Sequence, residues 1–487
     1  MSEICLSLAE KTIEDLNRVY HEEKSLVGMV ELRIDALQKF DVKVLQAFVE
    51  TIRQDQKKIV WTVRYQKEQG FFQGTEEKRL DLILLGDDLK VDWIDIEYKS
   101  ELWQKIELEH AKLLLSYHNF DKTEDNLTEL IKSMELTKAD LVKVAFATAS
   151  LADAVKVCKL YTENSKPLIA IAMGEYGECS RILPAVKGMP WTYASSGAGA
   201  TAPGQVSAYA LKKLYRLDQV NEDTKCFTVI GNPIAHSLSP YVHNTQYVND
   251  QLNALYVKIR VDEISAFYEI ADLFNLQGAS VTVPHKENIM NHADDSHWLK
   301  QVGAANTLIR KGNQWAIENT DIDAAIESIR AVLTLESPKV LILGSGGVSK
   351  GLASGMKRAG WQVTVTNRTQ SKAEALSQQI GIDWLAWEDR DAHGFDVIVN
   401  GTVLGMEPDT ERTPLEFYGS HTGLVVFDTV YTPEHTRFLK EAREVGAESI
   451  SGREMFYRQA ALQHAHWFDV PAPFAEMQVI MESLNIG

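Results

Sequence analysis

A lysine in the first half of the chain stands where an amine could react with a carbonyl group. Lys143 is flanked by valines within the apolar run 141–147, which reads as a buried strand. Strands of parallel sheets are buried on both faces, so an ammonium group there is costly unless it is paired or neutral. Burial and nearby cations favour the neutral amine, which can attack a ketone. Lys143 is therefore a candidate Schiff-base nucleophile.

A histidine at the end of the preceding apolar run could move a proton in such a reaction. His118 closes the run 113–118, and Glu97 closes the run 93–98 and could orient the imidazole. Glu31, Arg33 and Arg64 also stand at the ends of apolar runs. A structural salt bridge is a simpler explanation for any one of these side chains. Their common position at strand ends is what indicates a site.

The second half contains a pattern for different chemistry, the binding of a nucleotide. Residues 339–343 predict a buried strand, 344–348 a glycine-rich turn, and the residues after them a helix and then a strand at 362–366. Glycines let a pyrophosphate approach the backbone at a helix N-terminus, as in nucleotide-binding βαβ units. The residues predicted to bind the cofactor are Gly344, Gly346, Gly347, Val348, Asn367, Arg368, Thr369, Lys372 and Thr402.

The end of the strand 362–366 indicates which dinucleotide binds. An NAD site usually carries Asp or Glu there for the ribose hydroxyls. Here Arg368 follows the strand and Lys372 is close behind. These cations suit a 2′-phosphate, which a carboxylate would repel. The sequence therefore favours NADP(H) over NAD(H).

The first half supplies elements that could position the lysine and the histidine. Helix-like segments at 42–56, 76–85, 123–134, 151–163 and 204–214 alternate with eight apolar runs. Those runs are 4–9, 29–34, 58–64, 93–98, 113–118, 141–147, 168–174 and 191–195. This alternation predicts an α/β fold with an N-terminal (β/α)8 TIM barrel, whose catalytic groups lie at the carboxyl ends of the strands.

The second half predicts a two-lobed α/β region with a Rossmann lobe. The expected domains are the barrel at 1–218, a substrate-binding lobe at 224–334 completed by helices at about 453–487, and an NADP-binding lobe at 335–452. The polar stretch 217–225 joins the halves and contains no run of Gly or Ser. We therefore expect a stiff connection rather than a long flexible tether.

Composition excludes several classes of partner. The 487 residues carry a net charge of −18, which argues against nucleic acid as a partner. No apolar run is long enough to span a membrane, and the first residues do not read as a signal or transit peptide. The four cysteines have no metal-ligand spacing, and we expect buried, reduced thiols in a cytoplasmic protein.

Motifs spread through the whole first half resemble type I 3-dehydroquinate dehydratase. They are Glu-Leu-Arg-x-Asp (31–35), Thr-x-Arg (62–64), Asp-Ile-Glu (95–97), Ser-Tyr-His-x-Phe (116–120), Lys-Val-Ala (143–145), Met-Gly-x-x-Gly-x-x-Ser-Arg (173–181) and Ala-Pro-Gly-Gln (202–205). The resemblance implies an imine between Lys143 and the substrate, with His118, held by Glu97, as the proton-transfer group and no metal. The substrate-binding residues it implies are Glu31, Arg33, Arg64, Arg181, Thr201 and Gln205. Thr201 stands where that family usually has serine.

The second half resembles shikimate dehydrogenase over its full length. The resemblance rests on motifs at 231–244, 281–286, 303–307, 319–321, 367–369, 400–406, 428–431 and 452–461. It implies that Lys286 and Asp321 form the catalytic pair. The residues it places around the substrate are Ser237, Ser239, Thr282, Asn306, Tyr431 and Gln459. Departures from the family pattern, such as Ile322 and Gly401, remove no catalytic group.

Together the two resemblances predict a bifunctional shikimate-pathway enzyme. The first half would dehydrate 3-dehydroquinate to 3-dehydroshikimate, and the second would reduce that product to shikimate with NADPH. One alternative is that the second half is an NAD-linked quinate dehydrogenase, because the two activities share most motifs. The other is a non-catalytic, quinate-sensing regulator, which should have lost residues such as Lys143, Lys286 and Asp321.

Overall fold

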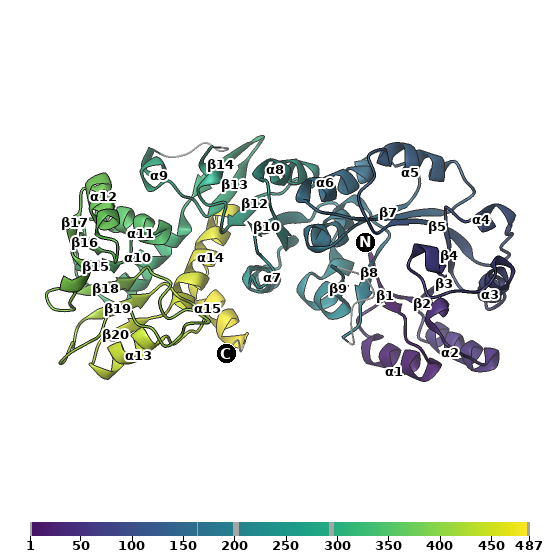
Figure 1. Cartoon of the computed structure of the whole chain (residues 1–487), viewed down its shortest axis with the longest axis horizontal. Coiled ribbons are helices and arrows are strands. Elements are labelled where there is room, and N and C mark those ends of the chain that lie inside the picture. Colours follow the sequence, from purple (N-terminus) through teal and green to yellow (C-terminus); the bar gives the residue numbers. More distant parts are fainter. Residues whose placement is uncertain (1, 163, 198–203, 292–296, 485–487) are drawn as a thin grey trace. The chain divides into compact units, whose positions relative to one another are not determined.

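A computed structural model describes residues 2–162, 164–197, 204–291 and 297–484. The chain forms two compact units (Figure 1). The first comprises Met1–Pro240 and Gln251–Leu276, and the second Tyr241–Asp250 and Gln277–Gly487. The first unit therefore extends beyond the polar stretch 217–225. The boundaries expected for the functional domains stay a prediction.

The first unit contains the expected parallel barrel. Its strands are β1 (Glu3–Leu8), β2 (Met29–Arg33), β3 (Lys58–Thr62), β4 (Trp93–Glu97), β5 (Lys112–Asn119), β6 (Leu141–Ala147), β7 (Leu168–Met173) and β8 (Trp191–Ser195). Each strand from β1 to β6 pairs in parallel with the strand that follows it, and β8 pairs in parallel with the other edge of β1. Among the described residues no ladder joins β7 to β8, so the barrel is open along that edge.

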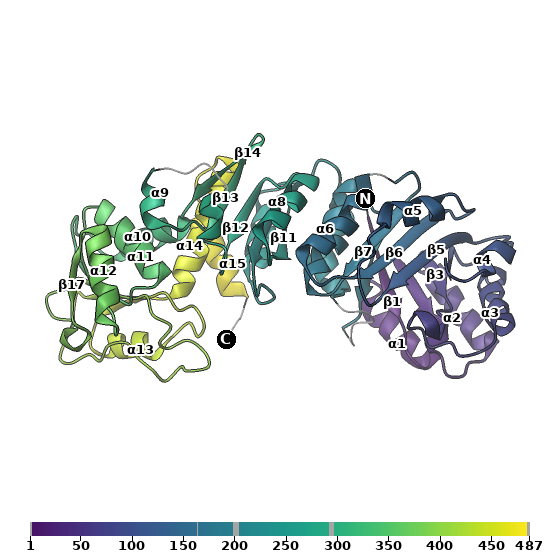
Figure 2. The same ribbon diagram turned by 45° about the horizontal axis from the view of Figure 1, so that its top comes forward.

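Helices surround this sheet in Figures 1 and 2. They are α1 (Ile13–Glu23), α2 (Val42–Gln54), α3 (Glu76–Asp88), α4 (Leu102–Lys105), α5 (Leu127–Glu135) and α6 (Leu151–Lys159). The side chains of Thr12 and Ser150 cap α1 and α6 by accepting bonds from backbone N–H groups. Since helices cover the outside and side chains fill the inside, β7 is buried at every position.

In their described residues, the last two barrel connections lack regular α-helices. After β7 come the 3-10 segments η4 (Glu175–Arg181) and η5 (Leu183–Lys187), and after β8 come β9 (Val206–Ser207) and the π-helical turn η6 (Ala210–Leu214). The helix expected over 204–214 is therefore a short strand followed by one wide turn. Gly174 and Gly188 adopt positive φ and bound this 3-10 region at its two ends.

The first unit continues past the barrel. A 3-10 turn, η7 (Leu217–Gln219), leads to β10 (Lys225–Gly231), which runs parallel to β11 (Ala254–Arg260) and is followed by α8 (Ile264–Leu273). The connection is short and bonded at both ends. Arg216 donates to the carbonyl of Ala254, and the N–H of Lys225 donates to the carbonyl of Asn253.

The second unit begins with the antiparallel strands β12 (Gly278–Val281), β13 (Thr307–Lys311) and β14 (Gln314–Glu318). Its helices include α9 (His297–Val302), α10 (Thr320–Val332), α14 (Gly452–Phe468) and α15 (Phe474–Ser483), and α7 (Ser239–Asn249) begins in the first unit. The indole of Trp467 in α14 donates to the carbonyl of Leu308 in β13 at 3.0 Å. The C-terminal helix α14 thus packs on the strands of this lobe.

The rest of the second unit is a Rossmann sheet, as expected. Its parallel strands lie in the order β17-β16-β15-β18-β19-β20. They are β15 (Lys339–Leu343), β16 (Gln362–Thr366), β17 (Asp383–Leu385), β18 (Val397–Asn400), β19 (Val425–Asp428) and β20 (Glu448–Ile450). The helices α11 (Gly347–Arg358), α12 (Gln370–Ile380) and α13 (Arg437–Glu444) connect them. The strand order reverses between β15 and β18, which is where such sheets bind ligands.

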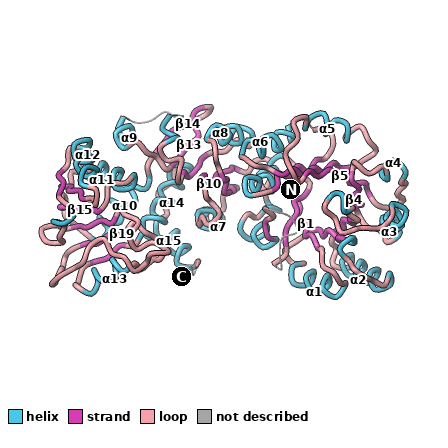
Figure 3. The backbone as a smooth tube through the Cα atoms, viewed as in Figure 1, coloured by secondary structure: helices cyan, strands magenta, loops and turns pink. Residues whose placement is uncertain are grey.

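Figure 3 shows strands alternating with helices and loops along both units. All four cysteines are buried and free of disulfides, as the sequence predicts. Within the described part of the chain no helix is both long enough and apolar enough to cross a membrane.

Candidate active sites

A cavity of about 140 Å³ opens at the carboxyl ends of the barrel strands. Most of the residues predicted for the first site line it together: Glu31, Arg33, Arg64, His118, Lys143, Arg181 and Gln205. Two predicted residues are missing from this lining. Thr201 lies outside the described residues. Glu97 borders a neighbouring cavity of about 540 Å³ instead.

Lys143 reaches into the cavity from β6 and lies among carboxylates. Its Nζ is 3.2 Å from Oδ2 of Asp95 and 3.9 Å from Oε1 of Glu31. It also lies 4.1 Å from the centre of the Tyr193 ring. The side chain is 7% exposed, so the amine is almost withdrawn from solvent yet borders the cavity. This is a setting in which the amine can meet a bound ketone and pass a proton to a neighbour.

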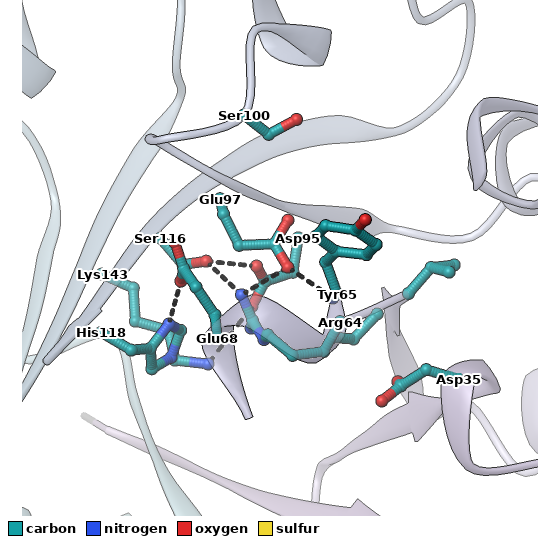
Figure 4. A network of polar contacts seen from close by, with 12 residues as sticks. Asp35, Arg64, Tyr65, Glu68, Asp95, Glu97, Ser100, Ser116, His118 and Lys143 are labelled. Carbon is teal, nitrogen blue, oxygen red and sulfur yellow. Dashed lines mark hydrogen bonds and ion pairs between the residues drawn. The ribbon is translucent and has the colours of Figure 1, made fainter. Parts of the chain in front are cut away.

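Asp95 forms ion pairs with two cations, Arg64 and Lys143 (Figure 4). It accepts a bond of 2.7 Å from Arg64 and one of 2.5 Å from Ser116. Burial alone would raise the pKa of Asp95, but Arg64 and Lys143 lower it well below its usual range. Asp95 therefore remains a carboxylate and holds both cations in place. The sequence pattern places it on a strand end but gives it no role.

The partner of His118 differs from the expected one. Nδ1 of His118 lies 3.3 Å from Oε2 of Glu68. Glu97 instead forms ion pairs with Arg79 and Arg64 and accepts a bond from the N–H of Tyr65 at 3.0 Å. In the described structure, the expectation that Glu97 holds His118 is therefore wrong.

Glu68 reaches His118 from a loop rather than from a strand. It ends the 3-10 turn Gln66–Glu68 after β3, where Gln69 turns the chain with φ 54°. The patterns considered above are confined to strand ends, so they do not single out Glu68. Glu68 follows Arg64 by four residues in a loop, and no local pattern in the sequence marks its contact with His118.

His118 is buried, and burial lowers its pKa well below the ordinary 6.5. The cations Arg64 and Lys143 lower it further, while Asp95 opposes them. The imidazole is therefore neutral at neutral pH, the form that can accept a proton. Its ring stacks on Phe120, with ring centres 5.9 Å apart.

The remaining cavity groups suit an anion that also carries hydroxyls. Arg33 is paired with Asp35 at 2.8 Å, and Glu31 accepts bonds from Ser7 and Thr62. Burial lowers the pKa of Arg181 to about 10, which leaves it charged at neutral pH. Guanidinium groups bind carboxylates with paired hydrogen bonds.

The second predicted site contains an ion pair of lysine and aspartate. Nζ of Lys286 lies 2.6 Å from Oδ2 of Asp321, with the side chains 29% and 20% exposed. Lys286 lies in the loop after β12, and its carbonyl accepts a bond from the N–H of Ala305. Asp321 lies in the first turn of α10, where Asn319 caps the helix. Both side chains are thus partly exposed to solvent, while hydrogen bonds hold the backbone segments that carry them.

Asn306 is the centre of a neighbouring buried network. Its side-chain NH2 group donates to the hydroxyl of Thr320 at 3.0 Å and to the side-chain oxygen of Gln459 at 3.5 Å. Its side-chain oxygen accepts a bond from the backbone N–H of Thr320. This network joins β13, α10 and α14. The carbonyl of Thr282 accepts the N–H of His285.

The other three predicted substrate-binding residues lie on loops or at a helix start. Tyr431 is half exposed and lies against Phe456, with ring centres 6.0 Å apart. Ser237 and Ser239 belong to the first compact unit, where the N–H of Ser239 donates to the Ser237 hydroxyl at 3.4 Å.

The glycine-rich turn has the geometry of a nucleotide site. Gly344 follows β15 directly and has φ +107°, and a Cβ there would meet Thr402 at 2.9 Å. Gly346 and Gly347, at the start of α11, have open space where a Cβ would stand. Such open backbone at a helix N-terminus fits a pyrophosphate.

The residues predicted to contact the rest of the nucleotide flank this turn. Asn367, whose amide donates to the carbonyl of Thr369, comes just after β16, and Arg368 and Lys372 are exposed beside it. Thr402 follows β18 and is held by Asn400 through two bonds of 3.0 and 2.7 Å. Val348 is exposed at the turn.

A lysine-centred barrel cavity, and a lysine–aspartate pair in the unit that also contains the Rossmann sheet, define an enzyme with two sites. The family model for type I 3-dehydroquinase matches residues 4–222. The model for the shikimate dehydrogenase substrate binding domain matches 229–308, and that for shikimate/quinate 5-dehydrogenase matches 327–403.

Known relatives include one that spans both halves. The bifunctional 3-dehydroquinate dehydratase/shikimate dehydrogenase of Arabidopsis thaliana, a chloroplastic protein, is 34% identical over 91% of this chain and 78% of its own length. The chain belongs to the family of bifunctional 3-dehydroquinate dehydratase/shikimate dehydrogenases.

Other relatives match the second half alone. The NADP(+) shikimate dehydrogenase of Syntrophobacter fumaroxidans is 38% identical over 51% of this chain and 89% of its own. A shikimate dehydrogenase solved with NADP+ has a TM-score of 0.52 and 28% identity, covering 55% of this chain and 98% of that one.

Proposed function

We propose that this chain catalyses two consecutive reactions, the dehydration of 3-dehydroquinate to 3-dehydroshikimate and the NADPH-dependent reduction of that product to shikimate. One observation carries the first reaction most directly. Lys143 lies in one cavity with the neutral base His118 and the charged residues Arg33, Arg64 and Arg181.

In the proposed dehydration, the amine of Lys143 attacks the substrate ketone and water leaves as the imine forms. The unprotonated amine is the form that attacks, and Asp95 and Glu31 lie 3.2 and 3.9 Å from its Nζ. His118 then takes the proton next to the imine carbon, and the imine holds the electron pair. His118 returns this proton to the departing hydroxyl, which leaves as water. Hydrolysis of the imine releases product and the free lysine.

In this mechanism Glu68, rather than Glu97, orients the base. The bond of Glu68 to Nδ1 of His118 leaves Nε2 for the substrate. The arginines bind the carboxylate and the hydroxyls of the substrate, together with Gln205 and Thr201.

In the proposed reduction, bound NADPH supplies a hydride to the carbonyl carbon. The carbonyl oxygen becomes an alkoxide and needs a proton, which the Lys286–Asp321 pair supplies. We assign the substrate hydroxyls and carboxylate to Ser237, Ser239, Thr282, Asn306, Tyr431 and Gln459. Arg368 and Lys372 would bind the 2′-phosphate of the cofactor, which supports NADP(H) over NAD(H).

Borohydride reduction tests the dehydration step. Treating the full chain with 3-dehydroquinate and borohydride should leave a stable covalent adduct on Lys143, identified by peptide mass mapping. His118→Ala should retain the adduct, because that histidine acts after the imine has formed. An adduct on another lysine, or none, would refute the mechanism.

Substrate and cofactor comparison tests the second half. Oxidation of shikimate with NADP+ should exceed oxidation of quinate with NAD+. Arg368→Ala should lower kcat/KM for NADP+ by about tenfold or more, since a hydrogen bond to a charged group contributes about 1.5–3 kcal/mol. The rate with NAD+ should stay unchanged, and Arg443→Ala, an exposed arginine of α13, serves as the control. Faster NAD-linked oxidation of quinate would favour the alternative activity.

A further inference from the structure

Two cations on β11 contact loops that belong to both proposed sites. Lys258 and Arg260 lie two residues apart, so their side chains leave the strand on the same face. Both lie beyond residue 222, where the match to the dehydratase family ends, and within the part that matches the dehydrogenase substrate domain. Both also belong to the same compact unit as the barrel.

On one side the two cations hold the loop that carries Ser237 and Ser239. Arg260 donates to the side-chain oxygen of Asn232 at 2.9 Å. Lys258 donates to the carbonyl of Ala235 at 3.3 Å. These contacts fix the loop two to five residues before the proposed substrate-binding serine Ser237.

On the other side the same two cations hold η4, the segment that ends at Arg181. Arg260 forms an ion pair with Glu175 and lies 4.8 Å from the centre of the Tyr176 ring. Lys258 lies 3.5 Å from Glu178. Contacts to three residues within four positions thus hold a segment whose form is a 3-10 helix rather than a regular α-helix.

Glu178 connects this contact to the barrel cavity. Its side chain is 25% exposed, and burial raises its pKa, which Lys258 opposes. Glu178 in turn favours the charged form of Arg181, whose pKa burial lowers to about 10. Removing Lys258 would therefore raise the pKa of Glu178. A protonated Glu178 would no longer favour the charged form of Arg181 in the cavity.

We propose that Lys258 and Arg260 are positioning residues for both reactions, because they fasten the Ser237 loop and the η4 segment to one strand. The proposal rests on the proposed function of both sites. It makes the dehydratase depend on residues from the dehydrogenase part of the sequence. Because the same two side chains touch both loops, a change on either side should affect substrate binding on the other.

Kinetics of full-length variants test this. Lys258→Met keeps the length of the side chain and removes its charge. It should raise KM for 3-dehydroquinate and KM for shikimate, each by about two- to tenfold, the range expected for a residue that acts through neighbours. Both kcat values should stay within about twofold, because neither cation touches the reacting atoms. Lys258→Arg keeps the charge and should restore both KM values.

Two further variants separate positioning from general damage. Lys159→Met removes an ion pair of 2.7 Å between α6 and Glu269 of α8, which joins the same two parts but touches neither loop. It should change neither KM. Glu178→Gln, made on the barrel side, should raise KM for shikimate, and this result decides the question if Lys258→Met does not fold.

The outcomes are distinguishable. If the wild-type chain lacks either activity, the proposed function fails. The positioning proposal is overturned if the wild-type chain has both activities, Lys258→Met changes only the KM for shikimate, and Glu178→Gln changes only the KM for 3-dehydroquinate. Equal effects of Lys159→Met and Lys258→Met would also overturn it, since any weakening of the packing would then suffice.

Discussion

Glu68 and Glu97 are both buried carboxylates of the barrel, but their partners give them different functions. Glu68 contacts His118, and Glu97 pairs with the buried cation Arg79. Glu68→Gln should therefore lower kcat for dehydration by about tenfold or more, since general acid–base catalysis as a whole contributes about 10²–10⁴-fold. The folded state should keep its thermal stability.

Glu97→Gln is the matched comparison. It leaves Arg79 buried with a weakened partner, and breaking a buried pair costs about 3–5 kcal/mol. Its main effect should be a lower Tm in thermal unfolding. A large loss of kcat at unchanged Tm would instead restore Glu97 as the group that orients His118.

The pH dependence of dehydration follows from His118. The neutral imidazole is the reactive form, and burial with the nearby cations lowers its pKa below 6.5. kcat/KM should therefore be constant from neutral pH down to 6.5 and fall only at lower pH. Unfolded His118 takes up a proton as the pH falls through 6.5 while the folded residue does not, so stability also declines below that pH. An acid limb with its midpoint above 6.5 in a pH–rate profile would contradict this assignment.

At the scale of elements, two glycines of the glycine-rich turn should have different roles. We expect Gly344 to matter for folding and Gly346 for cofactor binding. Gly344 has φ +107°, and a Cβ there would approach Thr402, so Gly344→Ala should lower Tm of the chain. Gly346 has an ordinary φ of −75° and open space around it. Gly346→Ala should leave Tm unchanged and raise KM for NADPH, because its methyl group occupies the space proposed for the phosphates. The reverse pattern in unfolding and steady-state assays would exclude this geometry.

The apolar runs predict the barrel strands closely, because a buried parallel strand must be apolar on both faces. The run at 141–147 coincides with β6, and the helix-like segment 42–56 with α2 (Val42–Gln54). Prediction fails in the described parts of the last two connections of the barrel. The segment after β7 is two 3-10 turns, and 204–214 is not a regular helix.

The candidate sites are predictable to the extent that their residues lie at strand ends. Lys143 on β6, His118 on β5 and Arg64 just after β3 come together because parallel strands of one barrel carry them. The contact of Glu68 with His118 depends on the path of a loop. The ion pairs of Lys258 and Arg260 join charged residues that are far apart in the sequence. No local pattern encodes those contacts.

At the scale of the whole molecule, the central claim is that one chain performs two successive reactions at separate sites. Each site has its own lysine, Lys143 in the barrel cavity and Lys286 beside Asp321. Removing one lysine should therefore stop one step and leave the other.

The most direct test supplies the full-length chain with 3-dehydroquinate and NADPH and identifies the products by chromatography. The wild-type chain should form shikimate, Lys286→Met should accumulate 3-dehydroshikimate, and Lys143→Met should leave 3-dehydroquinate unconverted while still reducing added 3-dehydroshikimate. Formation of shikimate by either variant from 3-dehydroquinate, or loss of both steps in one variant, would contradict the account.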